Sequence, residues 1–227
     1  GSLGKKKPKC LIDIKKNIKI IDKIIKELKD IEKINIVIGY KKNLLKNYLS
    51  KYNKKIKYIP NKHYQNKGNF YSALICKNKI TKSIILLDAD IILPKNSLQK
   101  FIKDKKKNLL MVNPKNLYNC DDIIVNLNKN EFIEKVFIKK KISNFGANFS
   151  SAGVIKMSHS ATKIFFSELS LINKSSKNQA YYEDAYKNLF KKIPFKIFTL
   201  KCERLEIDTI DDYKKLKKIT KKNNDYI

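Results

Sequence analysis

Two carboxylates, Asp88 and Asp90, directly follow the apolar run 84–87 (IILL). The run predicts a buried strand, and in an open α/β sheet ligands bind beyond the carboxyl ends of the strands. Two acids that stand one residue apart suit a hard cation such as Mg²⁺, which takes a few carboxylates together with phosphate oxygens of a substrate. The alternative is an aspartate that caps a turn or helix after the strand. Because both acids stand at the strand end, the sequence favours a metal site.

A second acidic pair, Glu206 and Asp208, ends the strand predicted before the last helix. Residues i and i+2 of a strand point the same way, so both carboxylates can face one ion. The alternative is helix capping, with Asp208 or Thr209 as the cap and Asp211 and Asp212 in the first turn. The two roles are compatible with each other.

A third acidic pair, Glu183 and Asp184, opens a predicted helix after Tyr181 and Tyr182. Acids at a helix N-terminus are stabilised by the helix dipole, which is a purely structural explanation. The functional alternative is recognition of a cationic or hydroxylated acceptor beside an aromatic wall.

The start of the chain, residues 1–11 (GSLGKKKPKCL), combines glycines with lysines. Glycine lets backbone N–H groups approach phosphates, and lysine neutralises their charge. The segment is therefore a candidate for phosphate binding, and a disordered basic arm is the alternative.

The composition is strongly basic: 227 residues include 51 basic and 21 acidic ones, for a net charge of +30. Such a charge suggests nucleic-acid binding. However, Arg204 is the only arginine and the lysines are spread along the whole chain, whereas nucleic-acid binders usually use arginine for bidentate contacts and stacking. We therefore expect no specific nucleic-acid partner, but an attraction for phosphorylated substrates that salt weakens.

The apolar patterning indicates a cytoplasmic protein without a membrane partner. The sequence has no apolar run of about 18 residues, as a membrane-spanning helix requires, and shows no secretory signal. Its four cysteines form no C-x-x-C pair, which is typical of reduced thiols. His63 and His159 show no zinc-ligand spacing.

These candidate residues must be positioned by segments that alternate between strand-like and helix-like patterns. In the first half, strands are predicted at 34–38, 55–59, 83–87 and 108–112, and helices at 18–33, 42–52, 69–79 and 97–105. In the second half, a hairpin is predicted at 122–127 and 132–138, strands at 152–157, 195–200 and 204–207, and helices at 160–169, 181–191 and 210–219. The alternation predicts an α/β, Rossmann-like single domain over 1–227, with a mostly parallel mixed sheet and helices on both faces. The tail, 221–227, is expected to fray.

Taken in order, several short segments resemble the nucleotidyltransferases that make activated sugars and alcohols. The segments are 8–14 (PKCLIDI), 37–40 (VIGY), 58–61 (YIPN) with 69–72 (NFYS), 87–90 (LDAD), 151–154 (SAGV) and 205–209 (LEIDT). The last of them resembles the second metal-binding motif of the choline-phosphate cytidylyltransferase branch. Each motif is short, but the ordered set extends from about residue 3 to about residue 218. The resemblance implies a GT-A-like fold.

The sequence departs from this family at its start. The family's first strand, central in the sheet, and most of its Gly-rich loop, which holds the triphosphate, have no counterpart. Residues 1–4 (GSLG) resemble the last residues of the loop but include no arginine. Residues 1–9 are therefore expected to form a partial nucleotide-binding loop. A nucleotide-binding homologue with impaired catalysis is one alternative that this departure leaves open.

The resemblance implies that an acceptor phosphate or phosphonate attacks the α-phosphorus of an NTP and that pyrophosphate leaves. The 206–208 motif favours CTP, with an alcohol phosphate such as phosphocholine or a phosphonate as the acceptor. A sugar phosphate with UTP, dTTP or GTP is the alternative within the family. A glycosyltransferase of the same general fold, acting on a nucleotide sugar, is a further alternative. The resemblance is also compatible with a homodimer.

The resemblance also implies roles for individual residues. The expected catalytic residues are Lys9, which would stabilise negative charge on the phosphates, and Asp90. The expected Mg²⁺ ligands are Asp90, Glu206 and Asp208. The expected nucleotide-binding residues are Gly4, Gly39, Asn69, Ser72 and Asp88. The residues expected to face the acceptor are Gly153, Glu183 and Asp184.

Overall fold

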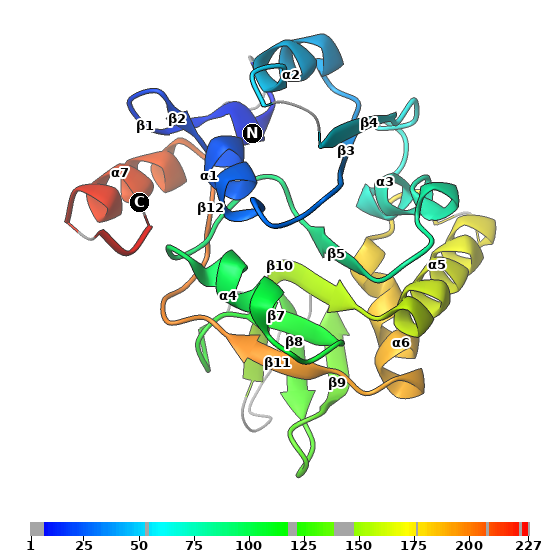
Figure 1. The fold of residues 1–227 in the computed structure, drawn as a ribbon. Helices are drawn as coiled ribbons and strands as arrows, with labels where there is room; N and C mark the ends of the chain where they lie inside the picture. The colour runs from blue at the N-terminus through cyan, green and yellow to red at the C-terminus, as the bar shows by residue number, and fades with distance from the viewer. Residues whose placement is uncertain are drawn as a thin grey trace.

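The computed structural model describes residues 7–52, 55–117, 122–138, 148–175, 177–207, 209–222 and 224–226. Its centre is a mixed sheet (Figure 1). The strands of this sheet are β5 (Ile84–Leu87), β7 (Leu109–Val112), β8 (Ile123–Leu127), β9 (Ile133–Ile138), β10 (Asn148–Met157) and β11 (Lys196–Thr199). Their order is β11-β7-β10-β8-β9, with β5 also paired to β10.

The longest strand of the sheet, β10, determines the strand directions. It runs antiparallel to β5, β7 and β8, whereas β11 is parallel to β7. Strands β5, β7 and β11 therefore share one direction, as in a parallel sheet. However, β5 and β7 do not pair with each other, because the antiparallel strand β10 lies between them. The expected α/β class with a mixed sheet is confirmed, but the expectation that this sheet is mostly parallel is wrong, because β11–β7 is the one parallel pairing among its described strands.

Three two-stranded pairs lie beside the central sheet. Strands β3 (Ile34–Ile38) and β4 (Ile56–Pro60) pair in parallel. Strands β1 (Asp13–Lys15) and β2 (Ile18–Lys19) form an antiparallel pair, as do β6 (Ile91–Ile92) and β12 (Leu205–Glu206). Among the described strands, β3 pairs with β4 alone and β5 with β10 alone, so the β3–β4 pair is not joined to the central sheet by hydrogen bonds.

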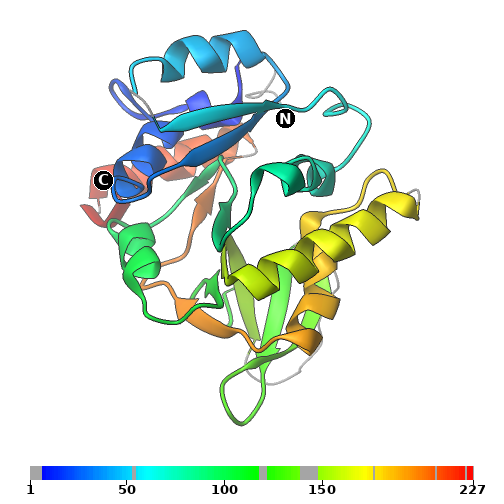
Figure 2. The same cartoon turned by 45° about the vertical axis from the view of Figure 1, so that its right-hand side comes forward.

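Helices cover both faces of the central sheet (Figures 1 and 2). On one face lie α3 (Asn69–Leu74), α5 (His159–Lys174) and α6 (Tyr186–Lys192); on the other lie α1 (Ile20–Glu27), α4 (Ser97–Lys103) and α7 (Ile210–Lys222). Because successive side chains of a strand point to opposite faces, β10 contributes to both cores. Ile155 and Met157 pack with α5 and α6, while Ala152 and Val154 pack with α1 and α4.

A third, smaller core lies under α2 (Lys42–Leu49). Leu45 and Leu49 of this helix pack on Ile38 of β3 and on Leu11 of the short 3₁₀ helix η2 (Lys9–Leu11). The burial of Leu11 therefore ties the segment that carries Lys9 to the body of the protein. No helix in the described ranges combines the length and apolar character needed to cross a membrane.

The described end of the chain differs from the expected frayed tail. Asn224–Tyr226 form a 3₁₀ helix, η5, and Tyr226 is buried. The Tyr226 hydroxyl donates a hydrogen bond to the Glu203 carbonyl at 2.6 Å, and Lys23 Nζ donates to the Tyr226 carbonyl at 2.6 Å. A buried aromatic ring with partners for its polar atoms outweighs the entropy of fraying here.

Candidate active site

The carboxylate of Asp88 lies against a bulge in β10. Pairing between β10 and β7 shifts between Ser151 and Val154, and within this bulge Gly153 has φ of +75°. The Asp88 N–H donates to the Gly153 carbonyl at 3.0 Å, and a Cβ on Gly153 would lie 2.7 Å from Asp88 Oδ2. Glycine is therefore required twice, for the left-handed backbone and for the close approach of the carboxylate.

Burial and neighbouring acids favour the protonated form of Asp88, although a hydrogen bond from Tyr182 opposes this. The Tyr182 hydroxyl donates to the carboxylate, with 3.1 Å to each oxygen. Desolvation raises the pKa of Asp88 to about 8, and the nearby charges of Glu183 and Asp90 act in the same direction. An adjacent cation would stabilise the ionised form.

Glu183 lies beside Asp88 in the 3₁₀ helix η4 (Tyr182–Ala185). The residue is only 7% exposed, and its Oε2 atom has no hydrogen-bond partner among the described residues. Desolvation raises the pKa of Glu183 to about 7, although hydrogen bonding from Tyr182 and Asn69 opposes the rise. The helix η4 is held to the start of α3, because Asn69 Oδ1 accepts a hydrogen bond from the Tyr182 N–H at 2.9 Å.

Two segments that are far apart in the sequence meet next to Asp88. Strand β12 pairs with β6, so that Glu206 stands opposite Ile91, the residue after Asp90. From the start of the chain, Lys9 Nζ lies 3.5 Å from Asp90 Oδ2. The expected proximity of the Lys9, Asp90 and Glu206 segments is therefore seen in the backbone register and in this ion pair.

The donor chemistry around Asp90 and Glu206 fits a hard divalent cation, because carboxylate oxygens are the ligands that Mg²⁺ prefers. The third expected ligand, Asp208, lies outside the described residues. Within the described part of the chain, no group of three or more His, Cys, Asp and Glu side chains is arranged to hold a metal ion. Two carboxylate-bearing segments are thus in place, and the complete ligand set remains a prediction.

Arg204, which the sequence did not indicate as a site residue, forms ion pairs with two acidic residues, Glu206 and Asp122. Its Nη1 lies 3.1 Å from Glu206 Oε2 and its Nη2 lies 3.5 Å from Asp122 Oδ1. Its backbone N–H donates to Asn113 Oδ1 at 2.8 Å. The signal in the sequence was that the only arginine of the chain stands two residues before Glu206.

Asp88, Glu183, Arg204 and Glu206 line a pocket of about 530 Å³, whereas Lys9 and Asp90 lie outside its lining. Its wall is formed by residues after β5, in the bulge of β10, in η4 and around β12. Six carboxylates line it: Asp88, Asp122, Glu183, Glu203, Glu206 and Asp212. Two cationic side chains, Arg204 and Lys215, also line it. The pocket is thus acidic within a strongly basic protein and is large enough for a small-molecule ligand.

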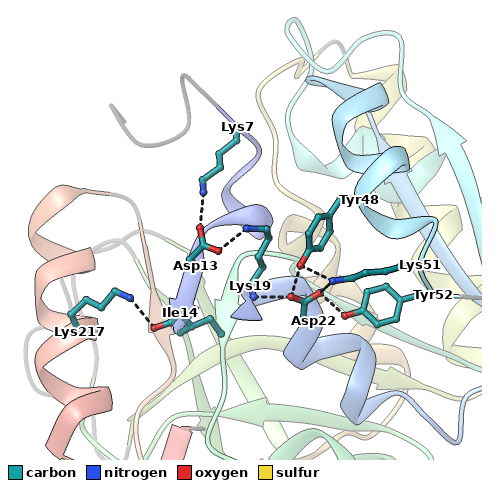
Figure 3. Close-up of polar contacts among 9 residues, drawn as sticks. All are labelled: Lys7, Asp13, Ile14, Lys19, Asp22, Tyr48, Lys51, Tyr52 and Lys217. Atoms are coloured by element: carbon teal, nitrogen blue, oxygen red, sulfur yellow. Dashed lines mark hydrogen bonds and ion pairs between the residues drawn. The ribbon is translucent and has the colours of Figure 1, made fainter. Parts of the chain in front are cut away.

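The β1–β2 hairpin, which follows the segment that carries Lys9, is fixed by contacts at Asp13 and Ile14 (Figure 3). Asp13 accepts hydrogen bonds from Lys7 Nζ at 2.9 Å and from Lys19 Nζ at 2.6 Å. From α7, Lys217 Nζ donates to the Ile14 carbonyl at 3.2 Å. The β1–β2 hairpin is therefore tied to the last helix, which follows the Glu206 segment.

A second network anchors α1 to α2 beside this hairpin (Figure 3). The Asp22 carboxylate accepts hydrogen bonds from the hydroxyls of Tyr48, at 2.6 Å, and Tyr52, and from the Lys19 N–H at 2.8 Å. Lys51 Nζ lies 3.1 Å from the same carboxylate. Hydrogen bonding from these tyrosines and Lys51 outweighs desolvation and lowers the pKa of Asp22. Asp22 therefore has a structural role, which is to join α1 to α2.

Several expected site residues, including Lys9 and Asp90, do not line the pocket. Gly39 follows β3, where a Cβ would lie 2.7 Å from Tyr64, so it allows close packing of a loop. Ser72 Oγ accepts a hydrogen bond from Asn61 Nδ2 at 3.0 Å. Asp184 Oδ2 accepts from the Tyr181 N–H at 2.9 Å and so caps η4, which is the structural alternative stated above. Gly4, like Asp208, lies outside the described residues.

Comparison with known proteins relates this arrangement to nucleotidyltransferases. Part of the chain is 36% identical, over 119 residues, to CTP:phosphoglutamine cytidylyltransferase of Campylobacter jejuni subsp. jejuni serotype O:2. That match covers 48% of this chain and 46% of the relative, so it spans about half the length of each protein.

Solved structures show a similar fold over nearly the whole chain. The CTP:phosphocholine cytidylyltransferase from Streptococcus pneumoniae superposes with a TM-score of 0.79 at 21% identity, covering 94% of this chain and 90% of that one. The inositol-1-phosphate CTP transferase from T. maritima superposes with a TM-score of 0.71 at 18% identity, covering 96% and 90%. These similarities confirm the fold that the resemblance predicted.

A family match extends over most of the chain. Residues 5–220 match the family described as "Domain of unknown function (DUF6564)". The match includes the segments that carry Lys9, Asp90, Glu183 and Glu206. The chain therefore belongs to the DUF6564 family, and it has the fold of the sugar-phosphate and alcohol-phosphate nucleotidyltransferases.

Proposed function

We propose that this chain is a nucleotidyltransferase that transfers CMP from CTP to a phosphorylated small molecule and releases pyrophosphate. The observation that carries the proposal is the meeting of the Lys9, Asp90 and Glu206 segments beside an acidic pocket. The partial match to a cytidylyltransferase supports the choice of CTP. UTP, dTTP and GTP are the competing nucleotides.

The proposed reaction needs positioning and charge neutralisation rather than covalent help from the protein. Lys9 neutralises negative charge on the nucleotide phosphates from its place beside Asp90. We assign Asp90, Glu206 and Asp208 as the residues that would hold Mg²⁺. When bound, Mg²⁺ would neutralise charge that develops on the phosphate oxygens.

The acceptor is proposed to enter the pocket of about 530 Å³. Glu183 and Asp88 then face the acceptor, and Gly153 leaves the space in which the Asp88 carboxylate lies. An attacking phosphate oxygen is already ionised near pH 7, so the reaction requires no general base. The raised pKa of Asp88 is therefore not needed for proton abstraction.

A pyrophosphate-release screen tests the proposal directly. The chain is mixed with Mg²⁺, each of the four NTPs and a panel of alcohol phosphates, phosphonates and sugar phosphates. The proposal expects pyrophosphate release that requires both the NTP and an acceptor, with CTP the best nucleotide. In a parallel assay a nucleotide sugar replaces the NTP. Release of nucleoside diphosphate in that assay would instead favour a glycosyltransferase. Absence of turnover, with calorimetric binding of CTP and Mg²⁺, would favour an impaired homologue.

A further inference from the structure

The sign of the charge in the pocket is opposite to that of the protein. Six carboxylates and two cationic groups line the pocket, whereas the chain has 51 basic and 21 acidic residues. Like charges brought together in a concave site repel one another unless a ligand or counterion compensates them. A phosphate group alone would add to this repulsion.

One carboxylate in the pocket lacks a partner. Glu183 is 93% buried, and its Oε2 atom accepts no hydrogen bond from any described residue. A buried acceptor without a donor is destabilising, and hydrogen bonds from a charged donor are the strongest compensation. The neighbouring Asp88 carboxylate accepts hydrogen bonds from the Tyr182 hydroxyl and has further acceptor capacity.

We propose that this pocket selects an acceptor that carries a protonated amine, whose N–H groups donate hydrogen bonds to Glu183 and Asp88. The inference rests on the proposed function and names the chemical class of its acceptor, an aminoalkyl phosphate or aminoalkyl phosphonate. The amine supplies both the positive charge and the hydrogen-bond donors that the two carboxylates require.

The residues that line the pocket favour an amine with N–H groups over a quaternary ammonium group. Quaternary ammonium ions are recognised by cages of aromatic faces, because they cannot donate hydrogen bonds. Tyr181 is the one aromatic residue among the described residues that line the pocket. The Tyr182 hydroxyl bonds to Asp88, and its ring packs in the core with Tyr186.

The test compares acceptors that differ in one group. Calorimetry measures the binding of 2-aminoethyl phosphate, 2-hydroxyethyl phosphate and phosphocholine to the full chain. Each titration is done with Mg²⁺, with and without the α,β-methylene analogue of CTP, which cannot release pyrophosphate. We expect 2-aminoethyl phosphate to bind about 30-fold more tightly than 2-hydroxyethyl phosphate, because a buried charged hydrogen bond is lost in the latter. Phosphocholine should bind more weakly than 2-aminoethyl phosphate.

Glu183→Gln should reduce the preference for the amine to less than about threefold, since the charge is removed at nearly constant size. Asp184→Asn is the matched control, because it makes the same change in the adjacent residue, which caps η4 outside the pocket. It should keep the wild-type preference. Equal binding of the amine and the alcohol, no binding of either, or an unchanged preference in Glu183→Gln would overturn the inference.

The failure of this inference can be told apart from failure of the proposed function. Pyrophosphate release from CTP with an acceptor that has no amine, such as glucose 1-phosphate, at the same rate as with 2-aminoethyl phosphate, would refute the amine preference and leave nucleotidyl transfer intact. Conversely, selective binding of the amine without pyrophosphate release from any NTP would keep the pocket assignment and refute the enzyme.

Discussion

Lys9 and Asp90 form an ion pair, with Nζ 3.5 Å from Oδ2, although one stands near the start of the described chain and the other follows β5. Both side chains are about one-third exposed, so the pair contributes little to stability. The same exposure leaves both groups accessible to a ligand. A partly exposed lysine beside a carboxylate at a strand end is therefore better explained by binding than by folding.

Replacing Lys9 by alanine should lower turnover by about 100-fold, because a cation that neutralises phosphate charge is removed. Pyrophosphate release at saturating CTP measures the effect. The control is Lys106→Ala, since Lys106 is an exposed lysine that pairs with an aspartate, Asp104, away from the pocket. If the two variants have the same kinetics as the wild type, Lys9 is not part of the site.

The Asp90→Asn variant should keep its fold and lose turnover by two orders of magnitude or more, since the charge that holds the cation is removed. Asp90 is about 30% exposed, so the change leaves the core intact. Circular dichroism reports the fold, and pyrophosphate release reports the activity. Normal pyrophosphate release by a folded Asp90→Asn variant would refute the metal role of this residue.

Much of the fold could be predicted from local patterns. The strand at 34–38 was predicted with its observed bounds, because a run of five residues, four of them β-branched and apolar, is ended by Gly39. The hairpin β8–β9 was also predicted, as the turn 128–130 separates two apolar runs. By contrast, β6 and β12 are two residues long, and their pairing depends on tertiary contacts. No periodicity exists in segments of that length.

The Gly153→Ala variant should destabilise the protein by about 1–3 kcal/mol, because φ is +75° and the added methyl group meets Asp88 Oδ2. Chemical denaturation measures the loss. In an Asp88→Ala background the carboxylate is absent, so the cost should fall to that of the left-handed backbone, about 1 kcal/mol. The same cost in both backgrounds would show that the two residues are not coupled.

The acid Glu183 should make the stability of the ligand-free protein depend on pH. Its pKa is raised by desolvation to about 7 in the folded chain, from an ordinary value of 4.5. Between these values the folded chain keeps a proton that the unfolded chain has released, so stability falls as the pH rises from 4.5 to 7. The loss due to Glu183 is on the order of 3 kcal/mol.

Denaturation at a series of pH values checks this dependence. Between pH 5 and pH 7.5, Glu183→Gln should lose less stability than the wild type, since the glutamine does not titrate. Glu168→Gln is the control: Glu168 is also buried, but its hydrogen bond to Lys192 at 2.7 Å lowers its pKa, so it is ionised in both states throughout this range. Parallel curves for the wild type and Glu183→Gln would contradict the raised pKa.

The site was less predictable than the fold. Strand-end acids such as Asp88 and Asp90 could be identified from their place after an apolar run. The partners of Asp88 could not be identified from the sequence, because Tyr182 and the bulge at Gly153 come close to Asp88 only in the tertiary fold. The role of Asp184 was ambiguous for a physical reason: an acid at the third position of a helix caps it whether or not a ligand is near.

The central claim is that Asp90 and Glu206, from two distant segments, hold one divalent cation beside a bound nucleotide. Electron paramagnetic resonance of Mn²⁺, titrated into the chain with CTP, counts bound ions without requiring turnover. We expect one Mn²⁺ per chain in the wild type and at least tenfold weaker binding in both Asp90→Asn and Glu206→Gln. Mn²⁺ binding that is unchanged in both variants would contradict the account.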